Sequence, residues 1–409
     1  MHVLLVAPFF LENTLRYARA LAAIPGVRLG LLSCEPEGKL QHVDPALAAL
    51  VAGHYVVRPA MDGATLAEGV SAFQRAWGRV DRLLGVLEQL QVPLGEARSA
   101  TGVPGMKVDQ ALNFRDKDRM KEVLRAAGLP VARHRRLESV QDGVDFVGEV
   151  GFPIILKPVA GVGAKATFRV ADRAALQSAL EQLQPSAARP VQAEEFITGV
   201  ERTFETVMID GEPVWWSGTR YHPTPLAVLE HPWMQYTVTL PREIDAPWTT
   251  FRETNHAALR ALGLVTGISH MEWFERPDGS FVIGEVGARP PGVNIMPMMS
   301  LAFGRDMIEA WCRLMVLGTW DVPATRQRAA GTAFFRGQGR GGVVVAVDGL
   351  ERAQHEVGRY VVDRKLPVVG QPASTSYEGE GWAIVAAPTT AEVTTALGGL
   401  VRGVKVVLG

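Results

Sequence analysis

The stretch that most constrains the fold spans residues 268–292 and reads ISHMEWFERPDGSFVIGEVGARPPG. Two apolar runs, Ile268–Phe274 and Phe281–Val286, flank a Pro-Asp-Gly-Ser turn, which predicts two antiparallel strands joined by a hairpin loop. Because side chains alternate along a strand, this register places Glu272 and Glu285 opposite each other, with Cβ atoms about 5 Å apart. Like charges so placed repel each other unless a cation lies between them, and a divalent cation with oxygen ligands is the simplest remedy.

The ordinary alternative to a metal site is an edge hairpin from which both Glu side chains extend into solvent. Two features of the stretch favour a site instead. The carboxylates stand among Ile, Met, Trp, Phe and Val, and Arg289 follows Glu285 by four residues in a Pro- and Gly-rich exit. His270 precedes Glu272 by two residues and therefore shares its face, either as part of the site or as a histidine of the core.

Composition excludes several classes of function. With a formal net charge of −1, the chain offers no basic stripe for nucleic acid, so we expect no nucleic-acid partner. No apolar run approaches the roughly 20 residues that span a bilayer, so we expect no membrane partner. Cys34 and Cys312 are too few and too far apart for a disulfide or zinc framework. The first residues lack a basic segment and a cleavage site, so a cytoplasmic location is the expectation.

Residues 1–105 are predicted to form an α/β domain. His2–Phe10 and Arg28–Leu32 are expected strands on either side of an amphipathic helix over Glu12–Ala23, and His54–Val57 is a further short strand. Apolar residues at helical spacing predict one long helix over Thr65–Gln91. The turn after the first strand lacks G-x-G-x-x-G, so a dinucleotide site loses its main support.

Turn-rich segments suggest the domain boundaries. Residues 93–105 are rich in Gly and Pro, and residues 319–328 read as a linker. We therefore expect domains over 1–105, 106–320 and 330–409, with a lid subdomain at about 130–195 in the second. The third is predicted to hold short strands and a helix near Thr390–Leu400, and no chemistry is visible in it.

Lys157 ends an apolar strand, Ile154–Leu156. Burial of an unpaired ammonium costs several kcal/mol, so a Lys at this position needs an anion. The loop that follows contains Gly161, Gly163 and Lys165, and its backbone N–H groups can turn toward phosphate oxygens. The loop is not a Walker A motif, and a simple turn with a snorkelling Lys remains the alternative.

Two further segments carry charge at the ends of predicted elements. Lys117 lies in the first turn of an amphipathic helix that ends at Gly128, where a solvated surface Lys is the ordinary reading. Val191–Ile197, reading VQAEEFI, is a predicted strand, and Glu201 follows it closely. Backbone hydrogen bonds at the end of such a strand suit a flat base in an apolar slot, while a surface acidic pair is the alternative.

These motifs together resemble the ATP-grasp superfamily. They occur in that family's order along the chain: a D-K helix start, a strand-ending Lys with a Gly-rich loop, an E-E-F-I hinge and a Glu…Glu…Arg hairpin. The resemblance covers about residues 110–310 and is weaker in the flanks. It implies an α/β protein with α+β lobes, an N-terminal Rossmann-like pre-ATP-grasp domain and a small C-terminal α/β element. Where many members carry Asn, this chain has Gly287, which leaves one metal contact to water, backbone or phosphate.

The resemblance also implies cofactors and site residues. ATP and Mg²⁺ are the expected cofactors, with Mn²⁺ as an alternative metal. Glu272 and Glu285 are the implied metal ligands, and Arg289 and Lys157 the implied catalytic residues. In the hinge, the Glu194–Glu195 region and the Ile197 backbone would bind adenine, and Glu201 the ribose hydroxyls. The full nucleotide-binding set is Lys117, Lys157, Gly161, Gly163, Lys165, Glu194, Glu195, Phe196, Ile197 and Glu201.

The implied activity is that of an ATP-dependent carboxylate–amine ligase, which forms an amide or peptide bond through an acylphosphate. The E-V-G-A-R-P-P-G run most resembles the amino-acid, dipeptide-forming ligases, so small-molecule carboxylate and amine substrates are expected, and a homodimer is left open. One alternative is an ATP-binding protein of this fold without ligase turnover, because Gly287 removes a usual metal ligand. A second is a biotin-carboxylase-like, bicarbonate-activating enzyme, although the chain contains no biotinyl A-M-K-M sequence.

Residues 219–241 read as a long insertion rich in Pro and aromatic residues. Loops of this length are usually functional or disordered, and this one is too aromatic for disorder. We expect it to cover the pocket of the acceptor substrate, with His222, Trp233 and Tyr236 as candidates for shaping that pocket.

Overall fold

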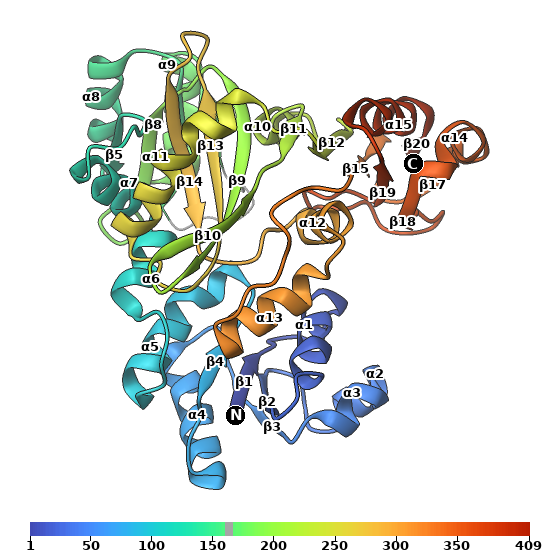
Figure 1. Cartoon of the computed structure of the whole chain (residues 1–409). Coiled ribbons are helices and arrows are strands. Elements are labelled where there is room, and N and C mark those ends of the chain that lie inside the picture. The colour runs from blue at the N-terminus through green and yellow to red at the C-terminus, as the bar shows by residue number, and fades with distance from the viewer. Residues whose placement is uncertain (160–166) are drawn as a thin grey trace.

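The computed structural model describes residues 1–159 and 167–409, and its helices and strands form three regions around a central sheet (Figure 1). The α/β class and the ATP-grasp architecture predicted from the sequence are confirmed. None of the helices in the described residues is long and apolar enough to cross a membrane.

The N-terminal region is a parallel sheet in the order β3-β2-β1-β4. Its strands are β1 (His2–Val6), β2 (Arg28–Ser33), β3 (Gly53–Val56) and β4 (Arg82–Leu84). Its helices are α1 (Glu12–Ala22), α2 (Lys39–Val43), α3 (Pro45–Leu50), α4 (Gly63–Trp77) and α5 (Gln91–Thr101), with the 3-10 turn η1 (Glu88–Leu90) after β4. Strands β1, β2 and β3 and helix α1 agree with the sequence prediction.

The predicted long helix over Thr65–Gln91 is wrong. Helix α4 ends at Gly78, whose φ of +86° closes the helix, and the chain then returns to the sheet as β4. Leu83 and Leu84 fit helical spacing but are buried in the sheet beside β1, because a short buried strand is apolar throughout. The turn-rich segment expected from residue 93 is largely helix α5.

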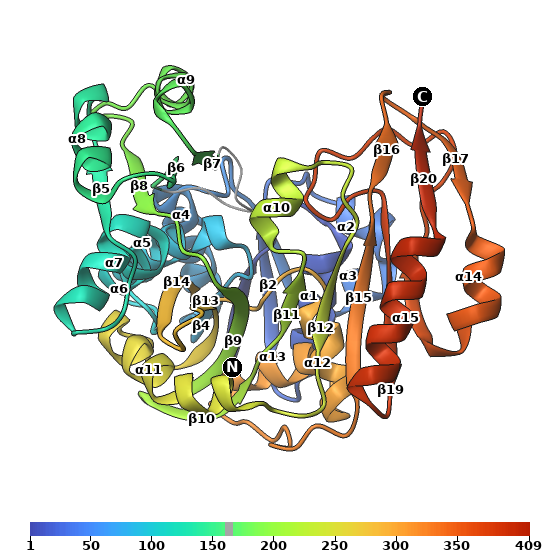
Figure 2. The ribbon, with the colours of Figure 1, turned by 90° about the horizontal axis from the view of Figure 1, so that it is seen from above.

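The lid sheet has the order β5-β8-β6-β7 and is antiparallel. Its strands are β5 (His134–Leu137), β6 (Ile154–Pro158), β7 (Phe168–Val170) and β8 (Val191–Glu195), and α8 (Val140–Val150) and α9 (Arg173–Leu183) cover one face of it (Figure 2). Two helices, α6 (Val108–Arg115) and α7 (Lys117–Ala126), precede it. Asp116 caps α7 by accepting hydrogen bonds from the N–H groups of Asp118 and Arg119.

The largest sheet in the described part of the chain has nine strands. Its order is β14-β13-β9-β11-β12-β15-β19-β18, and β10 pairs with β9 outside this path. The strands are β9 (Val200–Ile209), β10 (Glu212–Ser217), β11 (Arg220–His222), β12 (Tyr236–Leu240), β13 (Gly267–Glu275), β14 (Phe281–Gly287), β15 (Ala329–Phe335), β18 (Val361–Lys365) and β19 (Gly381–Ala387). Helix α11 (Ala246–Leu262) packs against β13, where Phe251 stacks on Trp273 at 4.2 Å between ring centroids.

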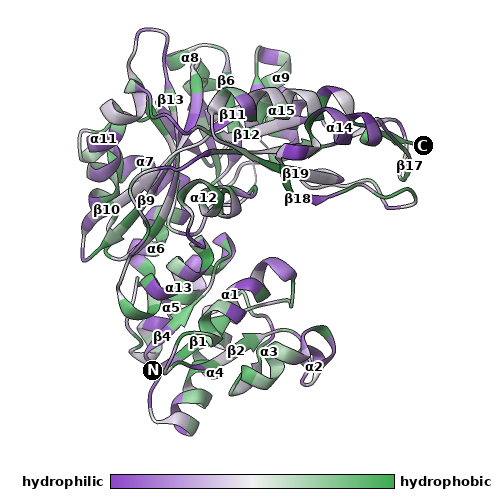
Figure 3. Cartoon of the chain, turned by 45° about the vertical axis from the view of Figure 1, so that its right-hand side comes forward, coloured by the Kyte–Doolittle hydropathy of each residue, from purple (hydrophilic) through white to green (hydrophobic). Residues whose placement is uncertain are grey.

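Helices α12 (Ile295–Phe303) and α13 (Met307–Leu317) join the central sheet to the N-terminal region. They share one apolar cluster with residues of β1, β2 and α1, and Tyr17 of α1 meets Trp311 of α13 edge to face. Helix α13 carries hydrophilic residues among its hydrophobic ones, whereas α12 is mostly hydrophobic along its length (Figure 3). The N-terminal region therefore packs directly against the sheet that carries the Glu hairpin.

Residues 219–241 are not the long loop predicted from the sequence. They form β11, the short helix α10 (Pro225–Glu230) and β12, and both strands lie inside the large sheet. Tyr236 is fully buried and stacks on Phe334 of β15. The pairing of β12 with β15 joins residues about 100 positions apart, and local sequence pattern does not reveal such contacts.

The C-terminal region adds β16 (Gly337–Gly339), β17 (Val344–Asp348) and β20 (Lys405–Leu408) as a separate sheet, with α14 (Leu350–Val357), η2 (Gly358–Tyr360) and α15 (Thr390–Gly403). Strands β15, β19 and β18 continue the large sheet across the boundary predicted near residue 330. The division into domains over 1–105, 106–320 and 330–409 stays a prediction.

Candidate active site

The Glu hairpin has the predicted register. Strands β13 and β14 are antiparallel, and Glu272 lies directly opposite Glu285. A β-bulge follows Glu272, and Gly284 lies at it, where an added Cβ would come within 3.0 Å of the Glu272 carbonyl oxygen. Glycine therefore lets the bulge form without a clash, and the bulge sets the position of the acidic pair relative to the rest of the hairpin.

Both carboxylates line a cavity of about 460 Å³ between the lid sheet, the large sheet and the N-terminal region. Every predicted site residue within the described part of the chain lines it. Gly161, Gly163 and Lys165 lie outside the described residues. The predicted residues that the cavity brings together are Lys117, Lys157, Glu194, Glu195, Phe196, Ile197, Glu201, Glu272, Glu285 and Arg289.

Lys117 reaches the hairpin from the first turn of α7. Its Nζ donates a hydrogen bond of 2.6 Å to Glu285 Oε1. Burial acts to raise the pKa of Glu285, but the nearby ammonium groups of Lys117 and Lys157 outweigh it and hold that pKa at about 2. Glu285 is therefore an anion at neutral pH, as a metal ligand must be.

A second buried cluster lies beside the first, on the lid strands. Glu194 Oε1 is 2.8 Å from Lys157 Nζ and 3.5 Å from Lys121 Nζ, and it accepts a hydrogen bond of 2.8 Å from Gln192. Burial acts to raise the pKa of Glu194, but Lys121 and Lys157 bring it below its usual value. The anion that Lys157 was expected to need is thus Glu194 in this structure, and a phosphate would approach the same ammonium from the cavity.

Lys121 is a residue of this cluster that the sequence reading missed. It is 1% exposed, and its Nζ also donates to the Gly284 carbonyl at 3.1 Å. The buried stripe of α7 is Lys117, Met120, Lys121 and Leu124, the i, i+3, i+4, i+7 spacing of a packed face. The presence of two Lys on a helix face whose other residues are apolar is the sequence feature from which Lys121 could have been predicted to be buried.

Glu272 differs from Glu285 in the direction of its pKa shift. Burial raises its pKa, with His270 acting against the shift and the Glu285 charge adding to it. Glu201, one strand away on β9, has its pKa raised well above the usual value by burial and by the Glu272 charge. The cavity wall therefore carries more carboxylate than its own cations neutralise, which is the electrostatic condition for a bound metal cation.

The donor set fits a divalent cation that also binds phosphate. Glu272 and Glu285 supply two hard oxygen ligands. The described residues contain no group of three His, Cys, Asp or Glu side chains able to hold a metal ion, so protein side chains alone would not complete the coordination shell. Two protein carboxylates leave most of the coordination shell to water and phosphate oxygens, the usual arrangement for nucleotide-bound Mg²⁺.

Gly287 is the position where the chain departs from the superfamily pattern. An added Cβ would meet only ordinary contacts of 3.7–3.9 Å, to Arg289 and the His270 carbonyl, and the backbone has no positive φ. We therefore expect Gly287→Asn to fold normally and to lower, by several-fold, the Mg²⁺ concentration needed for half-maximal nucleotide binding, because it adds an amide oxygen ligand. Calorimetric titration of nucleotide at several Mg²⁺ concentrations checks this, with Gly287→Ala as the control that adds bulk without a ligand. Equal Mg²⁺ dependence in both variants would contradict the expectation.

His270 lies in the lining of the cavity. Its Nδ1 is 2.8 Å from Glu205 Oε1, a carboxylate on β9 that is completely buried, and its Nε2 is 3.9 Å from Glu272 Oε1. The Glu205 contact fixes the orientation of the ring. His270 is thus a buried histidine with a hydrogen-bond partner and also part of the cavity lining, so a role in the site stays a prediction.

Arg289 is held from the N-terminal region. Its Nε and Nη2 donate to Glu88 Oε2 at 3.1 and 2.8 Å, and its Nη1 donates to the Pro290 carbonyl at 3.0 Å. Glu88 Oε1 faces Arg115 Nη1 at 3.6 Å. The sequence reading did not single out Glu88, since nothing near it in the chain marks a partner 201 residues away.

The cavity lining also includes apolar side chains of the kind that bind a flat base. Apolar side chains of Ile155, Phe196 and Phe274 line it, and the Arg169 guanidinium lies 4.5 Å from the Phe196 ring centroid. The Glu195 carboxylate accepts a hydrogen bond of 2.6 Å from Arg133 Nε, so its side chain is already engaged at the rim. Adenine contact by the Glu194–Glu195 region and Ile197 stays a prediction.

Residues 219–241, which were predicted to be an insertion over the acceptor pocket, do line the cavity, but the residues that line it are not the predicted ones. Tyr221 of β11 and Leu226 and Leu229 of α10 form part of the wall, together with Tyr377 from the segment before β19. His222, Trp233 and Tyr236 do not line this cavity: the first two are exposed and the third is in the core. The segment shapes the site because β11 and β12 anchor α10 over it.

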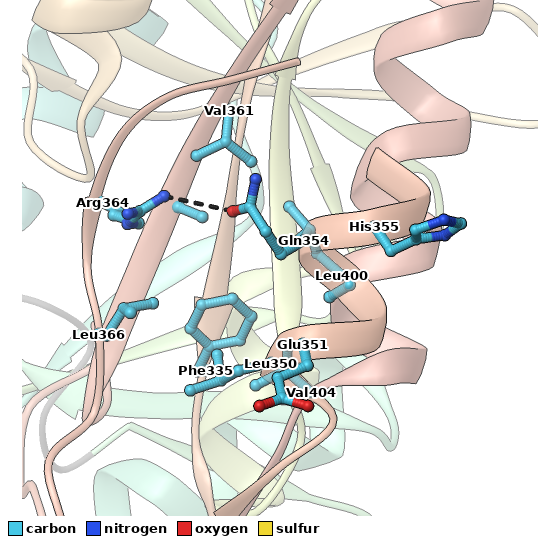
Figure 4. A pocket seen from close by; sticks show the side chains of 12 residues that line it. Phe335, Leu350, Glu351, Gln354, His355, Val361, Arg364, Leu366, Leu400 and Val404 are labelled. Carbon is cyan, nitrogen blue, oxygen red and sulfur yellow. Dashed lines mark hydrogen bonds between the residues drawn. The ribbon is translucent and has the colours of Figure 1, made fainter. Parts of the chain in front are cut away.

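A second cavity of about 510 Å³ lies in the C-terminal region between α14, α15 and β18 (Figure 4). Its lining is mostly apolar, and Arg364 donates a 3.4 Å hydrogen bond to Gln354 at one side. Its lining has no cluster of paired carboxylates and lysines like the one in the cavity lined by Glu272 and Glu285. The chemistry-bearing residues are therefore concentrated at the Glu hairpin.

The chain is similar to several known proteins. The family model described as "Carbamoyl-phosphate synthase L chain, ATP binding domain" matches residues 116–212. The L-arginine-specific L-amino acid ligase of Bacillus subtilis is 26% identical over 246 residues, which cover 58% of this chain and 58% of that protein. The carbamoyl phosphate synthase large chain of Clostridium acetobutylicum is 26% identical over 199 residues, covering 47% of this chain and 18% of that protein. The chain thus spans less than two thirds of the length of these two relatives.

Solved structures resemble the chain over its whole length. The L-amino acid ligase from Bacillus licheniformis has a TM-score of 0.77 and 18% identity, covering 100% of this chain and 98% of that one. The N5-carboxyaminoimidazole ribonucleotide synthetase from Thermotoga maritima has a TM-score of 0.69 and 17% identity, covering 100% and 99%. At these identities the likeness shows the fold. The chain therefore has the ATP-grasp fold, and residues 116–212 within it match the ATP-binding family model.

Proposed function

We propose that the protein is an ATP-dependent ligase that joins a carboxylate to an amine through an acylphosphate. The observation that carries the proposal is the single cavity in which the Glu272–Glu285 pair lies with Lys117 and Lys157. Phosphoryl transfer is mostly positioning and charge neutralisation, and two lysines beside two carboxylates are the parts that this chemistry requires.

Each group of residues that lines the cavity would have its own role in the reaction. Lys157 and Lys117 would neutralise phosphate oxygens, and the Ile155–Phe196–Phe274 slot would hold the base. Glu272 and Glu285 would hold Mg²⁺, with Mn²⁺ as an alternative, and the metal when bound would neutralise charge on the β- and γ-phosphates. Arg289 would orient the carboxylate substrate or stabilise the oxyanion formed when the amine attacks.

An amino acid is the class of substrate that the acceptor end fits best. Arg289 supplies N–H donors suited to a carboxylate, and Leu226, Leu229 and Val293 add apolar side chains to the lining of the same cavity. The Bacillus licheniformis structure of the same fold is an L-amino acid ligase. The cytoplasmic location and the homodimer stay predictions from the sequence.

The decisive experiment is a screen of amino-acid pairs for Mg²⁺-dependent phosphate release from ATP, with mass spectrometry of the products. A ligase releases ADP and phosphate only when both substrates are present and yields a product lighter than their sum by one water. Turnover that requires bicarbonate, and not an amino acid, would point to the carboxylase alternative. Nucleotide binding with no turnover in any mixture would contradict the ligase proposal.

A further inference from the structure

Arg289 lies on the segment after β14, yet its guanidinium is fixed by a residue of the N-terminal region. Glu88 stands at the start of η1, just beyond β4, and its side chain is 8% exposed. Among the described residues that line the cavity, it is the one supplied by residues 1–105. Ligands of parallel α/β sheets bind outside the carboxyl ends of the strands, and Glu88 occupies such a position relative to β4.

The hydrogen bonds leave a defined part of Arg289 facing the cavity. A guanidinium has five N–H donors. Nε and Nη2 each use one on Glu88 Oε2, and Nη1 uses one on the Pro290 carbonyl. Within residues 1–159 and 167–409, one donor then remains on each terminal nitrogen. A carboxylate or an oxyanion in the cavity can bind these two donors, because Glu88 already occupies the Nε side of the group.

We infer that Glu88 is a positioning residue for Arg289: it orients the guanidinium so that Nη1 and Nη2 point their remaining donors at the substrate. This inference rests on the proposed function for its kinetic consequence, but the Glu88–Arg289 contact itself does not. Glu88 also joins the N-terminal region to the reaction site, so the two regions must be packed together for Arg289 to be held.

The first test observes Arg289 directly and needs no turnover. The Nε–H signal of Arg289, assigned by its loss in Arg289→Lys, is expected to exchange slowly with water because Glu88 accepts it. In Glu88→Ala the exchange should be at least about 10-fold faster, since a buried hydrogen bond has been removed. An exchange rate that does not change would overturn the inference.

The second test measures turnover. Glu88→Ala should lower kcat/KM for the carboxylate substrate by about 10- to 100-fold, the cost of a small misplacement of a catalytic group, and leave KM for ATP unchanged. Glu88→Gln keeps an acceptor oxygen and should recover much of the loss. In an Arg289→Ala background the same substitution should change the rate less than about twofold, because it acts through a group that is no longer present. Full additivity of the two substitutions would overturn the inference.

The matched control is Glu212→Ala, which removes an exposed carboxylate paired with Arg260 and remote from the cavity. It should leave both the Arg289 exchange rate and the kinetic constants unchanged. If the wild-type protein shows no ATP turnover in any substrate mixture, the proposed function fails, and the exchange measurement still decides whether Glu88 holds Arg289.

Discussion

Glu285→Gln is expected to reduce ATP turnover by at least about 100-fold, and Glu285→Ala to abolish it, with the fold intact in both. The carboxylate accepts a hydrogen bond from Lys117 and faces Glu272 across the hairpin. Glutamine keeps the size of the side chain but removes its charge, so a metal would be left with Glu272 as its only carboxylate. Loss of one preorganised electrostatic group in an active site typically costs 10²–10³-fold in rate.

Metal dependence provides the second readout for this variant. The Mg²⁺ concentration for half-maximal nucleotide binding should rise in Glu285→Gln, and circular dichroism should match wild type. Asp278→Asn is the matched control, since Asp278 lies at the exposed tip of the same hairpin, where it accepts hydrogen bonds from Ser280. A near-wild-type rate in Glu285→Gln would show that the metal assignment is wrong.

The pKa of Glu285 has a consequence for the pH profile. Because the folded-state pKa is held at about 2, below the usual value near 4.3, Glu285 stays ionised at every pH above about 3. The stabilisation from its pairing is present above the unfolded-state pKa and is lost as pH falls through the folded-state pKa. An acidic limb in the rate between pH 5 and 7 would therefore belong to another group.

Lys157→Met is expected to weaken ATP binding by about 10- to 100-fold, which corresponds to about 1.4–2.7 kcal/mol. Lys157 Nζ is the ammonium nearest to Glu194 and also lines the cavity where phosphates are proposed to lie. The substitution removes a positive charge from the phosphate position. It also leaves Glu194 with Lys121 at 3.5 Å as its remaining cation, so a lower melting temperature is expected.

A double substitution tests the phosphate role again. Lys157→Met with Glu194→Gln removes one positive and one negative charge and leaves the buried Lys121 without its carboxylate, so neither the melting temperature nor the ATP affinity should recover. Lys39→Met, at the start of α2 and away from the cavity, is the control for loss of one positive charge. Calorimetry that found unchanged ATP affinity in Lys157→Met would refute the role of this residue.

The prediction of the site succeeded where the chemistry is local. The facing of Glu272 and Glu285 follows from a short hairpin loop and from the alternation of side chains along strands, so two residues 13 positions apart could be paired from sequence. Likewise, the position of Lys157 at the end of an apolar strand predicted that an anion lies beside it. The anion turned out to be Glu194 on the neighbouring strand β8.

The secondary-structure prediction failed where a strand pairs with another strand that is distant in sequence. The strand β4 was read as helix because its leucines fit both periods, and its burial depends on β1, which lies about 80 residues earlier. Residues 219–241 were read as a loop because β12 finds its partner in β15. Lys121 could have been recognised from the i, i+4 spacing with Lys117, but its partner Glu194 is again distant in sequence.

The sequence by itself therefore determined which residue types are candidates for the chemistry, the acidic hairpin and the resemblance to the superfamily, because these depend on short-range alternation and on the order of motifs. Only the tertiary structure decided which partner each charge has: Lys117 with Glu285, Lys157 and Lys121 with Glu194, and Arg289 with Glu88. The physical reason is that burial makes an unpaired charge costly, so each charge requires a partner, but the packing of separate elements selects which one.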